Sequence, residues 1–177
     1  ADLEKLGELI DGIEIAMLTT HAADGSLVSR PLQTLEFDRR GELVFFTSIA
    51  SRKVDELSAD RDVNLAYANP SKQTYVSVRG RARIDRDRAT IDALWSPAQN
   101  VFFTGGKDDP DLAVLRVCVR DAAYWEPAGH FLARALDFAK GMLSDEPRDL
   151  GKHGKLSGAA SSPRGAERHD AANDASS

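Results

Sequence analysis

Cysteine and long apolar runs are scarce in this chain of 177 residues. The one cysteine, Cys118, excludes an intrachain disulfide and fits a reducing compartment. No stretch approaches the roughly 20 apolar residues of a membrane span. The amino terminus is acidic and amphipathic, whereas a signal peptide begins with basic residues followed by an apolar run. We therefore expect a soluble, cytoplasmic protein that is not exported and has no membrane partner.

Surplus positive charge and catalytic motifs are also missing. The formal net charge is -5, whereas non-specific binding of nucleic acid depends on neutralising phosphates with excess Lys and Arg. The histidines are scattered without the spacing of metal ligands; they are His21, His130, His153 and His169. There is no nucleophile elbow, nucleoside triphosphatase phosphate loop or dinucleotide glycine fingerprint. We expect no nucleic-acid partner and no metal, and we assign no catalytic residue.

Alternating apolar and polar residues dominate what is present. Strand-like runs cover 14–20, 27–37, 42–47, 63–68, 73–85, 112–120 and 122–126. Helical spacing covers 2–11, 51–59, 88–95 and 131–143. Short turns such as Ala23-Asp24-Gly25 join neighbouring strands, which favours antiparallel pairing. The order predicts a mostly β fold, a small antiparallel barrel flanked by helices, because a parallel doubly wound sheet needs regular alternation of strands and helices.

The longest expected strand, 73–85, has two different faces. Alternate residues from Val76 to Ile84 are small or apolar and should face the core. The other face begins at Tyr75 and carries Arg79, Arg81 and Arg83. Since acidic residues follow closely, we interpret this outer face as solvated or subunit-facing and not as a nucleic-acid surface.

The carboxy-terminal part changes composition twice. The stretch Gly151-Lys152-His153-Gly154-Lys155 is basic and rich in glycine, which indicates only a flexible connection. From Ser157 onward no apolar residue is larger than alanine, and such a segment cannot build a core. We therefore predict one domain over 1–156 and a disordered tail over 157–177.

One strand-to-helix turn has the composition of a phosphate site. An apolar run over 43–46 leads into hydroxyl residues and then into Ser51-Arg52-Lys53. Hydroxyl groups donate hydrogen bonds to a phosphate, arginine offers a planar fork, and lysine adds a point charge. A helix beginning there would contribute the positive end of its dipole. The alternative is that Ser51 only caps the helix and the cations are exposed. Arg30 is either a second contributor to the phosphate site or a solvated arginine on an edge strand.

Ten stretches together resemble a known family in their order and spacing. They are 16–20, 24–25, 29–31, 45–47, 51–53, 63–65, 73–80, 94–95, 108–110 and 124–125. The chain resembles the FMN-binding split-barrel superfamily that includes pyridoxamine 5′-phosphate oxidase, and more closely its general stress protein 26 branch. The resemblance spans about residues 3–156. It implies an antiparallel split β-barrel of the FMN-binding type, decorated with flanking helices.

The resemblance also implies a cofactor and the residues that bind it. The cofactor would be FMN, with FAD as an alternative. The phosphate would be held by Arg30, Ser51, Arg52 and Lys53. The ribityl chain and the ring would be lined by Pro31, Gln33, Phe46, Thr47 and Ser48. Members of the family are homodimers with the flavin between subunits, so the partner chain would contribute Gln73, Tyr75 and Trp125. Trp95 and the Phe102-Phe103 loop would shape the outer edge of the cleft.

One departure from the family bears on the reaction. The oxidase has a carboxy-terminal arginine and histidine pair for its substrate phosphate, and no such pair is recognisable after Trp125, where Glu126-Pro127-Ala128-Gly129-His130 follows. We therefore do not expect oxidation of pyridoxamine phosphate. Two functions remain: an FMN-dependent oxidoreductase of unknown substrate, and a flavin-binding stress or signalling module that turns nothing over. A structural barrel that binds no flavin is a third hypothesis.

Overall fold

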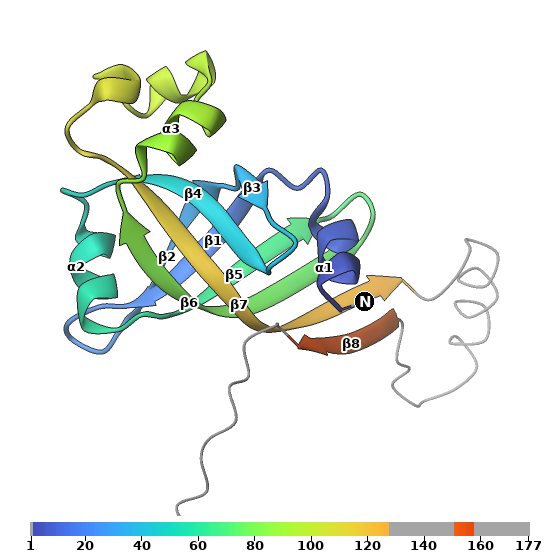
Figure 1. Cartoon of the computed structure of the whole chain (residues 1–177). Helices are drawn as coiled ribbons and strands as arrows, with labels where there is room; N and C mark the ends of the chain where they lie inside the picture. Colours follow the sequence, from blue (N-terminus) through green and yellow to red (C-terminus); the bar gives the residue numbers. More distant parts are fainter. Residues whose placement is uncertain (1, 128–150, 158–177) are drawn as a thin grey trace, which may run out of the picture.

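The computed structural model describes residues 2–127 and 151–157. One sheet of eight strands curls into a half-barrel, with three α-helices against its ends and outer face (Figure 1). In chain order the elements are α1 (Asp2–Ile10), β1 (Ile15–His21), β2 (Leu27–Gln33), β3 (Glu36–Phe37), β4 (Glu42–Ser48), α2 (Arg52–Ala59), β5 (Asp62–Asn69), β6 (Thr74–Asp85), α3 (Arg88–Leu94), the 3-10 helices η1 (Pro97–Val101) and η2 (Gly106–Asp108), β7 (Leu112–Pro127) and β8 (Gly151–Ser157). The predicted mostly β class and split barrel are confirmed.

The strands pair antiparallel throughout the described residues. Their order is β2-β1-β5-β6-β7-β4-β3, and β8 pairs with β7 outside this path. The sheet curls so that the chain leaving β2 meets β4, where the Leu35 amide donates to the Val44 carbonyl at 2.9 Å. This closure brings β2, β4 and the start of α2 together.

Strand β4 is buried on both faces, which explains its continuous apolar run. Leu43 and Phe45 belong to the main core inside the barrel, where α1 also packs. Val44 and Phe46 point the other way, into a second cluster beneath α3 that includes Ile91. The strand thereby places Phe46 outside the barrel, beside the candidate site. The predicted core face of β6 is confirmed, since its residues alternate between buried and exposed.

The structure corrects two sequence-based boundaries. The predicted strand 27–37 is two strands, β2 and β3, because the chain bends at Thr34, whose amide donates to the Glu14 carbonyl at 2.8 Å. The two predicted strands 112–120 and 122–126 are one strand, β7. Arg79 pairs with Asp121 and Gly80 with Val119, so Arg120 is an extra residue that forms a bulge.

The interpretation of 151–155 as a flexible connection is wrong, because these residues begin strand β8. Its pairing with the second half of β7 depends on backbone hydrogen bonds and leaves no apolar periodicity in the sequence. Gly154 lies against the Tyr124 ring, where an added Cβ would come within 2.6 Å of a ring carbon. β8 ends at Ser157, the first residue of the predicted tail. The predicted helix 131–143 and residues 158–177 lie outside the described residues.

Gly80 lies opposite the β7 bulge, where the backbones of β6 and β7 approach closely. A Cβ there would lie 2.5 Å from Val117 Cγ1 and 2.8 Å from the Cys118 carbonyl oxygen. The carbonyl belongs to the neighbouring strand's backbone and cannot move without disturbing the ladder. The close approach of β6 and β7 therefore requires glycine at this position.

We expect Gly80→Ala to lower the free energy of unfolding by roughly 1–3 kcal/mol, because the methyl group overpacks β6 against β7. Urea unfolding monitored by tryptophan fluorescence measures the change. Gly7→Ala is the matched control, since a Cβ at Gly7 meets only the Phe37 ring at 3.5 Å, an ordinary contact. In helix α1 the control should be neutral or stabilising by up to about 1 kcal/mol. Equal stability of Gly80→Ala and wild type would contradict the close-approach argument.

Candidate functional site

Two cavities adjoin at the start of α2. The aromatic cavity has a volume of about 450 Å³ and is lined by Ile15, Pro31, Leu32, Gln33, Leu35, Phe46, Thr47, Ser48, Lys53, Gln99, Phe102 and Phe103. The cationic cavity has a volume of about 660 Å³ and is lined by Ala22, Ala23, Asp24, Ser26, Val28, Arg30, Ser51, Arg52, Lys53, Asp55 and Glu56. Lys53 lines both, so one ligand with an aromatic part and an anionic part could span them.

The turn from β4 into α2 exposes the amino end of the helix to the cationic cavity. Ser51 stands at the N-cap position with an extended backbone, yet its side chain makes no capping hydrogen bond. Its hydroxyl instead donates to the Ser48 carbonyl at 2.7 Å. The simple capping alternative for the Ser51 side chain is therefore wrong. The first backbone N–H groups of a helix have no acceptor within it, and the residues that begin α2, Arg52 and Lys53, line the cationic cavity, where an anion could accept from them.

Lys53 is held at the junction of the two cavities. Its Nζ donates to Thr47 Oγ1 at 3.0 Å and to Ser51 Oγ at 3.2 Å. An ammonium group has three donors, so one is left for a ligand. Burial, with a further contribution from the charge of Arg30, lowers the pKa of Lys53, and Glu56 opposes that shift. An anion beside this amine would favour its charged form.

Arg30 is only partly satisfied by the protein. Its Nη2 donates to Glu56 Oε2 at 2.7 Å, and the two side chains are 20% and 13% exposed. The other terminal nitrogen, Nη1, is buried and has no hydrogen-bond partner; it is the one such side-chain atom among residues 2–127 and 153–157. Leaving a buried polar donor unpaired costs about 1–3 kcal/mol or more when it is charged. This orphaned donor fits an oxygen of an anionic ligand.

Glu56 is itself anchored from a third element. Its Oε2 also accepts a hydrogen bond from Thr20 Oγ1 at 2.6 Å, and Thr20 is almost fully buried. The hydrogen bond from Thr20, together with that from Arg30, lowers the pKa of Glu56 against the opposing effect of burial. The carboxylate is therefore ionised at neutral pH and remains bonded to Arg30.

Aromatic rings build one wall of the aromatic cavity. Phe46 lies 5.8 Å from Trp95 and 6.3 Å from Phe103 between ring centroids, and Trp95 lies 6.3 Å from Phe103. Trp95 contacts Phe46 and Phe103 without lining the cavity itself, and the third lining phenylalanine, Phe102, is largely exposed. Such a wall suits a flat aromatic ligand.

Two amide side chains add polar groups to the aromatic cavity. Gln99 is buried, and its Nε2 donates to Gln33 Oε1 at 3.3 Å. Its Oε1 accepts a hydrogen bond from the Ser96 amide at 3.1 Å and another from the Ser96 hydroxyl, which fixes the Gln99 side chain. The cavity thus combines apolar surface with a small number of oriented polar groups, the usual make-up of a cofactor pocket.

Nine of the twelve predicted site residues lie at these cavities. Around the aromatic cavity are Pro31, Gln33, Phe46, Thr47 and Ser48, around the cationic cavity are Arg30, Ser51 and Arg52, and Lys53 lies at both. The remaining three, Gln73, Tyr75 and Trp125, line neither. Tyr75 and Trp125 are cross-strand partners on β6 and β7 with half-exposed side chains. Gln73 precedes β6 with a φ of 51°. One chain alone does not bring these three to the site.

Sequence reasoning missed Thr20, Glu56 and Gln99. Glu56 follows Arg52 by four residues on α2, a spacing of opposite charges that is readable from the sequence. Gln99 completes a capping box with Ser96, and that spacing is readable from the sequence. Thr20 carried no signal, because a threonine in a strand is ordinary and only the fold brings it to Glu56.

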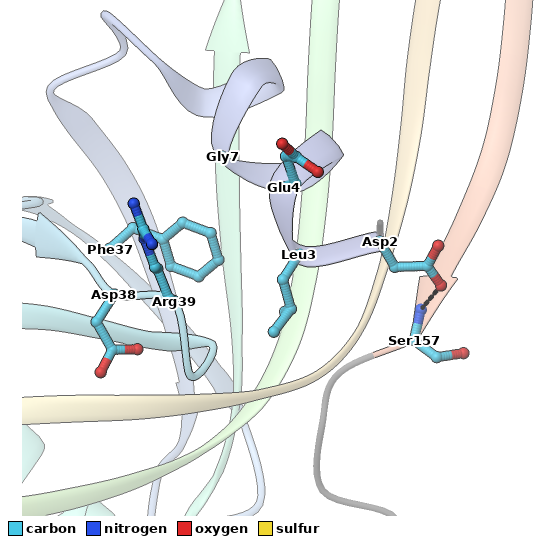
Figure 2. Close-up of a pocket in the computed structure, with 8 residues that line it drawn as sticks. All are labelled: Asp2, Leu3, Glu4, Gly7, Phe37, Asp38, Arg39 and Ser157. Atoms are coloured by element: carbon cyan, nitrogen blue, oxygen red, sulfur yellow. Dashed lines mark hydrogen bonds between the residues drawn. The ribbon is translucent and has the colours of Figure 1, made fainter.

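A larger hollow lies elsewhere, between α1 and the turn from β3 to β4. Its volume is about 790 Å³, and Figure 2 shows Phe37 and Leu3 lining it together with acidic side chains. Asp2 there accepts a hydrogen bond from the Ser157 amide at 3.2 Å, tying α1 to the end of β8 (Figure 2). It holds no buried unpaired polar side-chain atom among the described residues. Size alone therefore does not identify the functional site.

The part of the chain that the structure describes lacks two other kinds of feature, a metal cluster and a membrane-spanning helix. No three His, Cys, Asp or Glu side chains gather there as a metal site. No helix among those residues has the length and apolar character needed to cross a membrane.

Comparisons with known proteins give consistent matches. The family model for pyridoxamine 5′-phosphate oxidase-like proteins matches residues 1–149. The general stress FMN/FAD binding protein of Xanthomonas citri is 30% identical, with a TM-score of 0.62 over 73% of this chain and 92% of that one. A putative general stress family protein of Xanthomonas campestris pv. campestris is 31% identical, with a TM-score of 0.61 over 74% of this chain and 93% of that one. Protein bli-3 of Neurospora crassa is 26% identical over 88% of this chain and 79% of its own length.

Proposed function

Because the chain belongs to the family of pyridoxamine 5′-phosphate oxidase-like proteins, we propose that it is a flavin-binding general stress protein that holds FMN across the aromatic and cationic cavities. The observation that carries this proposal is the buried, unpaired Nη1 of Arg30. Arg30 lines the same cavity as Lys53, which also lines the aromatic cavity. A phosphate on an aromatic ring system is the kind of ligand that satisfies both.

The phosphate would be held by Arg30, Ser51, Arg52 and Lys53. A phosphate monoester carries between one and two negative charges at neutral pH, and these residues offer three cations and a hydroxyl. The amino end of α2 adds backbone donors and the positive end of the helix dipole. Among the described residues, this is the place where an anion would relieve both the orphaned donor and the cation repulsion.

The ribityl chain and ring would be lined by Pro31, Gln33, Phe46, Thr47 and Ser48, with Gln99 as an addition from the structure. The Xanthomonas citri relative is described as FMN/FAD binding, and the cationic cavity continues along the β1–β2 hairpin to Asp24 and Ser26. We therefore include FAD as an alternative cofactor. The direct experiment compares flavins that differ only in the phosphate.

We expect wild-type protein to quench FMN fluorescence with a Kd below about 1 mM, equivalent to roughly 4 kcal/mol. Arg52→Ala combined with Lys53→Ala should raise that Kd about tenfold or more, because two charged hydrogen-bond donors to the phosphate are lost. Riboflavin, which lacks the phosphate, is the control ligand and should bind both proteins alike. If wild type does not bind FMN in this range, flavin binding is refuted. If the double variant binds FMN as wild type does, only the phosphate assignment is refuted.

We further propose that the bound flavin serves as the redox group of an FMN-dependent oxidoreductase. A flavin supplies electron transfer, and the protein supplies position and electrostatics. Among the described residues, Lys53 is the one titratable side chain that lines the aromatic cavity. The protein therefore offers few groups there for acid–base catalysis. This same scarcity favours the second candidate, a flavin-binding stress or signalling module without turnover. Oxidation of pyridoxamine phosphate is not proposed, for lack of a recognisable arginine and histidine pair.

Mixing the flavin-loaded protein with NADH or NADPH in the absence of oxygen separates the two candidates. The oxidoreductase should lose its visible flavin absorbance faster than free FMN at the same concentration. The control is the Arg52→Ala and Lys53→Ala double variant, mixed with the same amount of FMN. If neither donor bleaches the bound flavin faster than free FMN, the nicotinamide-dependent reductase is refuted and the module is favoured.

A homodimer in the cytoplasm completes the proposal. An outward apolar patch crosses β1, β5, β6 and β7, and it comprises Met17, Ala66, Ala68, Tyr75 and Trp125. These residues are exposed, and the register places them on neighbouring strands as the pairs Met17 with Ala66, Ala68 with Tyr75, and Tyr75 with Trp125. An apolar patch on the open face of a sheet is typical of a contact with another protein. A second copy docked there would let Gln73, Tyr75 and Trp125 serve a neighbouring flavin.

We expect sedimentation velocity to give a dimer for wild type and a monomer for Ala66→Glu, because the new carboxylate would be buried without a partner at the centre of the patch. FMN affinity should fall in parallel, since the partner's contacts are lost. Ala89→Glu is the matched control on the exposed surface of α3 and should remain dimeric. A dimer in Ala66→Glu, or a monomer in wild type, would contradict this assembly.

A further inference from the structure

Three side chains from three elements form a hydrogen-bonded chain at the cationic cavity. Thr20 on β1 donates to Glu56 Oε2 at 2.6 Å, and Arg30 on β2 donates to the same oxygen through Nη2 at 2.7 Å. Glu56 projects from α2, so this one oxygen ties the helix to two strands. Thr20 is almost fully buried and Glu56 is 13% exposed, so water competes little for these bonds.

A carboxylate at this place is unexpected if the site only collects positive charge. Glu56 lines the cavity proposed for the phosphate, and its charge repels an anion. It also neutralises part of the charge that Arg30 brings. A residue with this cost to anion binding needs a compensating role.

Geometry supplies that role. The guanidinium group is planar and rigid, so fixing Nη2 also fixes the direction of Nη1. Nη2 is bound by Glu56, whereas Nη1 is buried without a protein partner. Without Glu56, the four rotatable bonds of the arginine side chain would allow Nη1 to turn toward other acceptors, Asp24 and Asp55 of the same cavity among them.

We propose that Glu56, anchored by Thr20, is a positioning residue that holds Arg30 Nη1 in place for the phosphate of the flavin. This inference rests on the flavin binding proposed above. Glu56 touches no phosphate oxygen itself and acts through Arg30. Its value to the site is the fixed direction of the donor, which outweighs the repulsion that its charge introduces.

Two substitutions at Glu56 separate positioning from charge. Glutamine keeps an oxygen that can accept from Thr20 and Arg30 but removes the negative charge, whereas alanine removes both. Positioning predicts that Glu56→Gln binds FMN as tightly as wild type or more tightly. It predicts that Glu56→Ala raises the Kd for FMN roughly tenfold or more, the effect of losing an oriented charged hydrogen bond. Riboflavin should bind both variants as it binds wild type.

The opposite patterns overturn the proposal. If Glu56 only repels the phosphate, both variants tighten FMN binding to a similar extent. If it only stabilises the fold, Glu56→Ala lowers the melting temperature and leaves the ratio of the FMN and riboflavin dissociation constants unchanged. Failure of wild type to bind FMN at all would instead refute the proposed function, and is distinguished by the wild-type titration alone.

A double-mutant cycle tests whether Glu56 acts through Arg30. In an Arg30→Met background, Glu56→Ala should no longer weaken FMN binding, and an undiminished loss there would refute the indirect action. If Glu56→Ala does not fold, Thr20→Val replaces it as the test, because valine keeps the shape of threonine and removes the hydroxyl donor. Thr20→Val should weaken FMN binding but not riboflavin binding. An unchanged FMN affinity in Thr20→Val refutes its anchoring part. Glu8→Ala, an exposed glutamate on α1, is the control for net charge and should match wild type.

Discussion

Three cationic side chains, Arg30, Arg52 and Lys53, meet at the amino end of α2, where the helix dipole adds to their mutual repulsion. The fold tolerates this arrangement because Lys53 and Arg30 are held from different directions, while Arg52 is exposed to solvent. Thr47 and Ser51 hold the lysine, and the fork of Arg30 is half satisfied. Crowded cationic side chains usually turn into water, and these hydrogen bonds prevent Lys53 and Arg30 from doing so. The fold therefore keeps positive charge concentrated at this end of the helix, where an anion would stabilise it.

The same region shows how the barrel and the site depend on one another. Strand β4 sends Phe45 into the main core and Phe46 into the cluster beneath α3, so a single strand supports both. The part of the cavity wall formed by Phe46 is thus an extension of the packed interior, whereas Phe102 and Phe103 come from the loop that follows η1. Rings held in this way can present a fixed face to a flat ligand, with little conformational entropy left to lose on binding. The cationic cavity, by contrast, depends on polar contacts between β1, β2 and α2.

Much of this architecture is readable from the sequence. The alternation along 73–85 predicts its core face, and the order of hydroxyls and cations over 47–53 predicts which residues meet at the helix start. The bulge at Arg120 could not be predicted, because it depends on how closely β6 and β7 approach at Gly80. β8 was hidden because its pairing with β7 depends on backbone hydrogen bonds, and its one large apolar residue, Leu156, packs against the main core without giving a periodic pattern. Thr20 and Glu56 are 36 residues apart, and only the packing of α2 against β1 brings them together. The roles of Gln73, Tyr75 and Trp125 depend on a second chain, so they stay predictions.

The long strand β7 changes neighbours along its length. Up to Cys118 it pairs with β4 on one side, and from Asp121 it pairs with β8 on that side, while β6 accompanies both halves. Every residue lining the aromatic and cationic cavities comes before residue 104 in the chain. β8 is consequently an additional strand beside the second half of β7, and none of its residues lines either cavity. Changes in β8 would therefore leave the residues that line both cavities in place, but they would alter the strand that pairs with Trp125, the residue proposed to serve a neighbouring flavin.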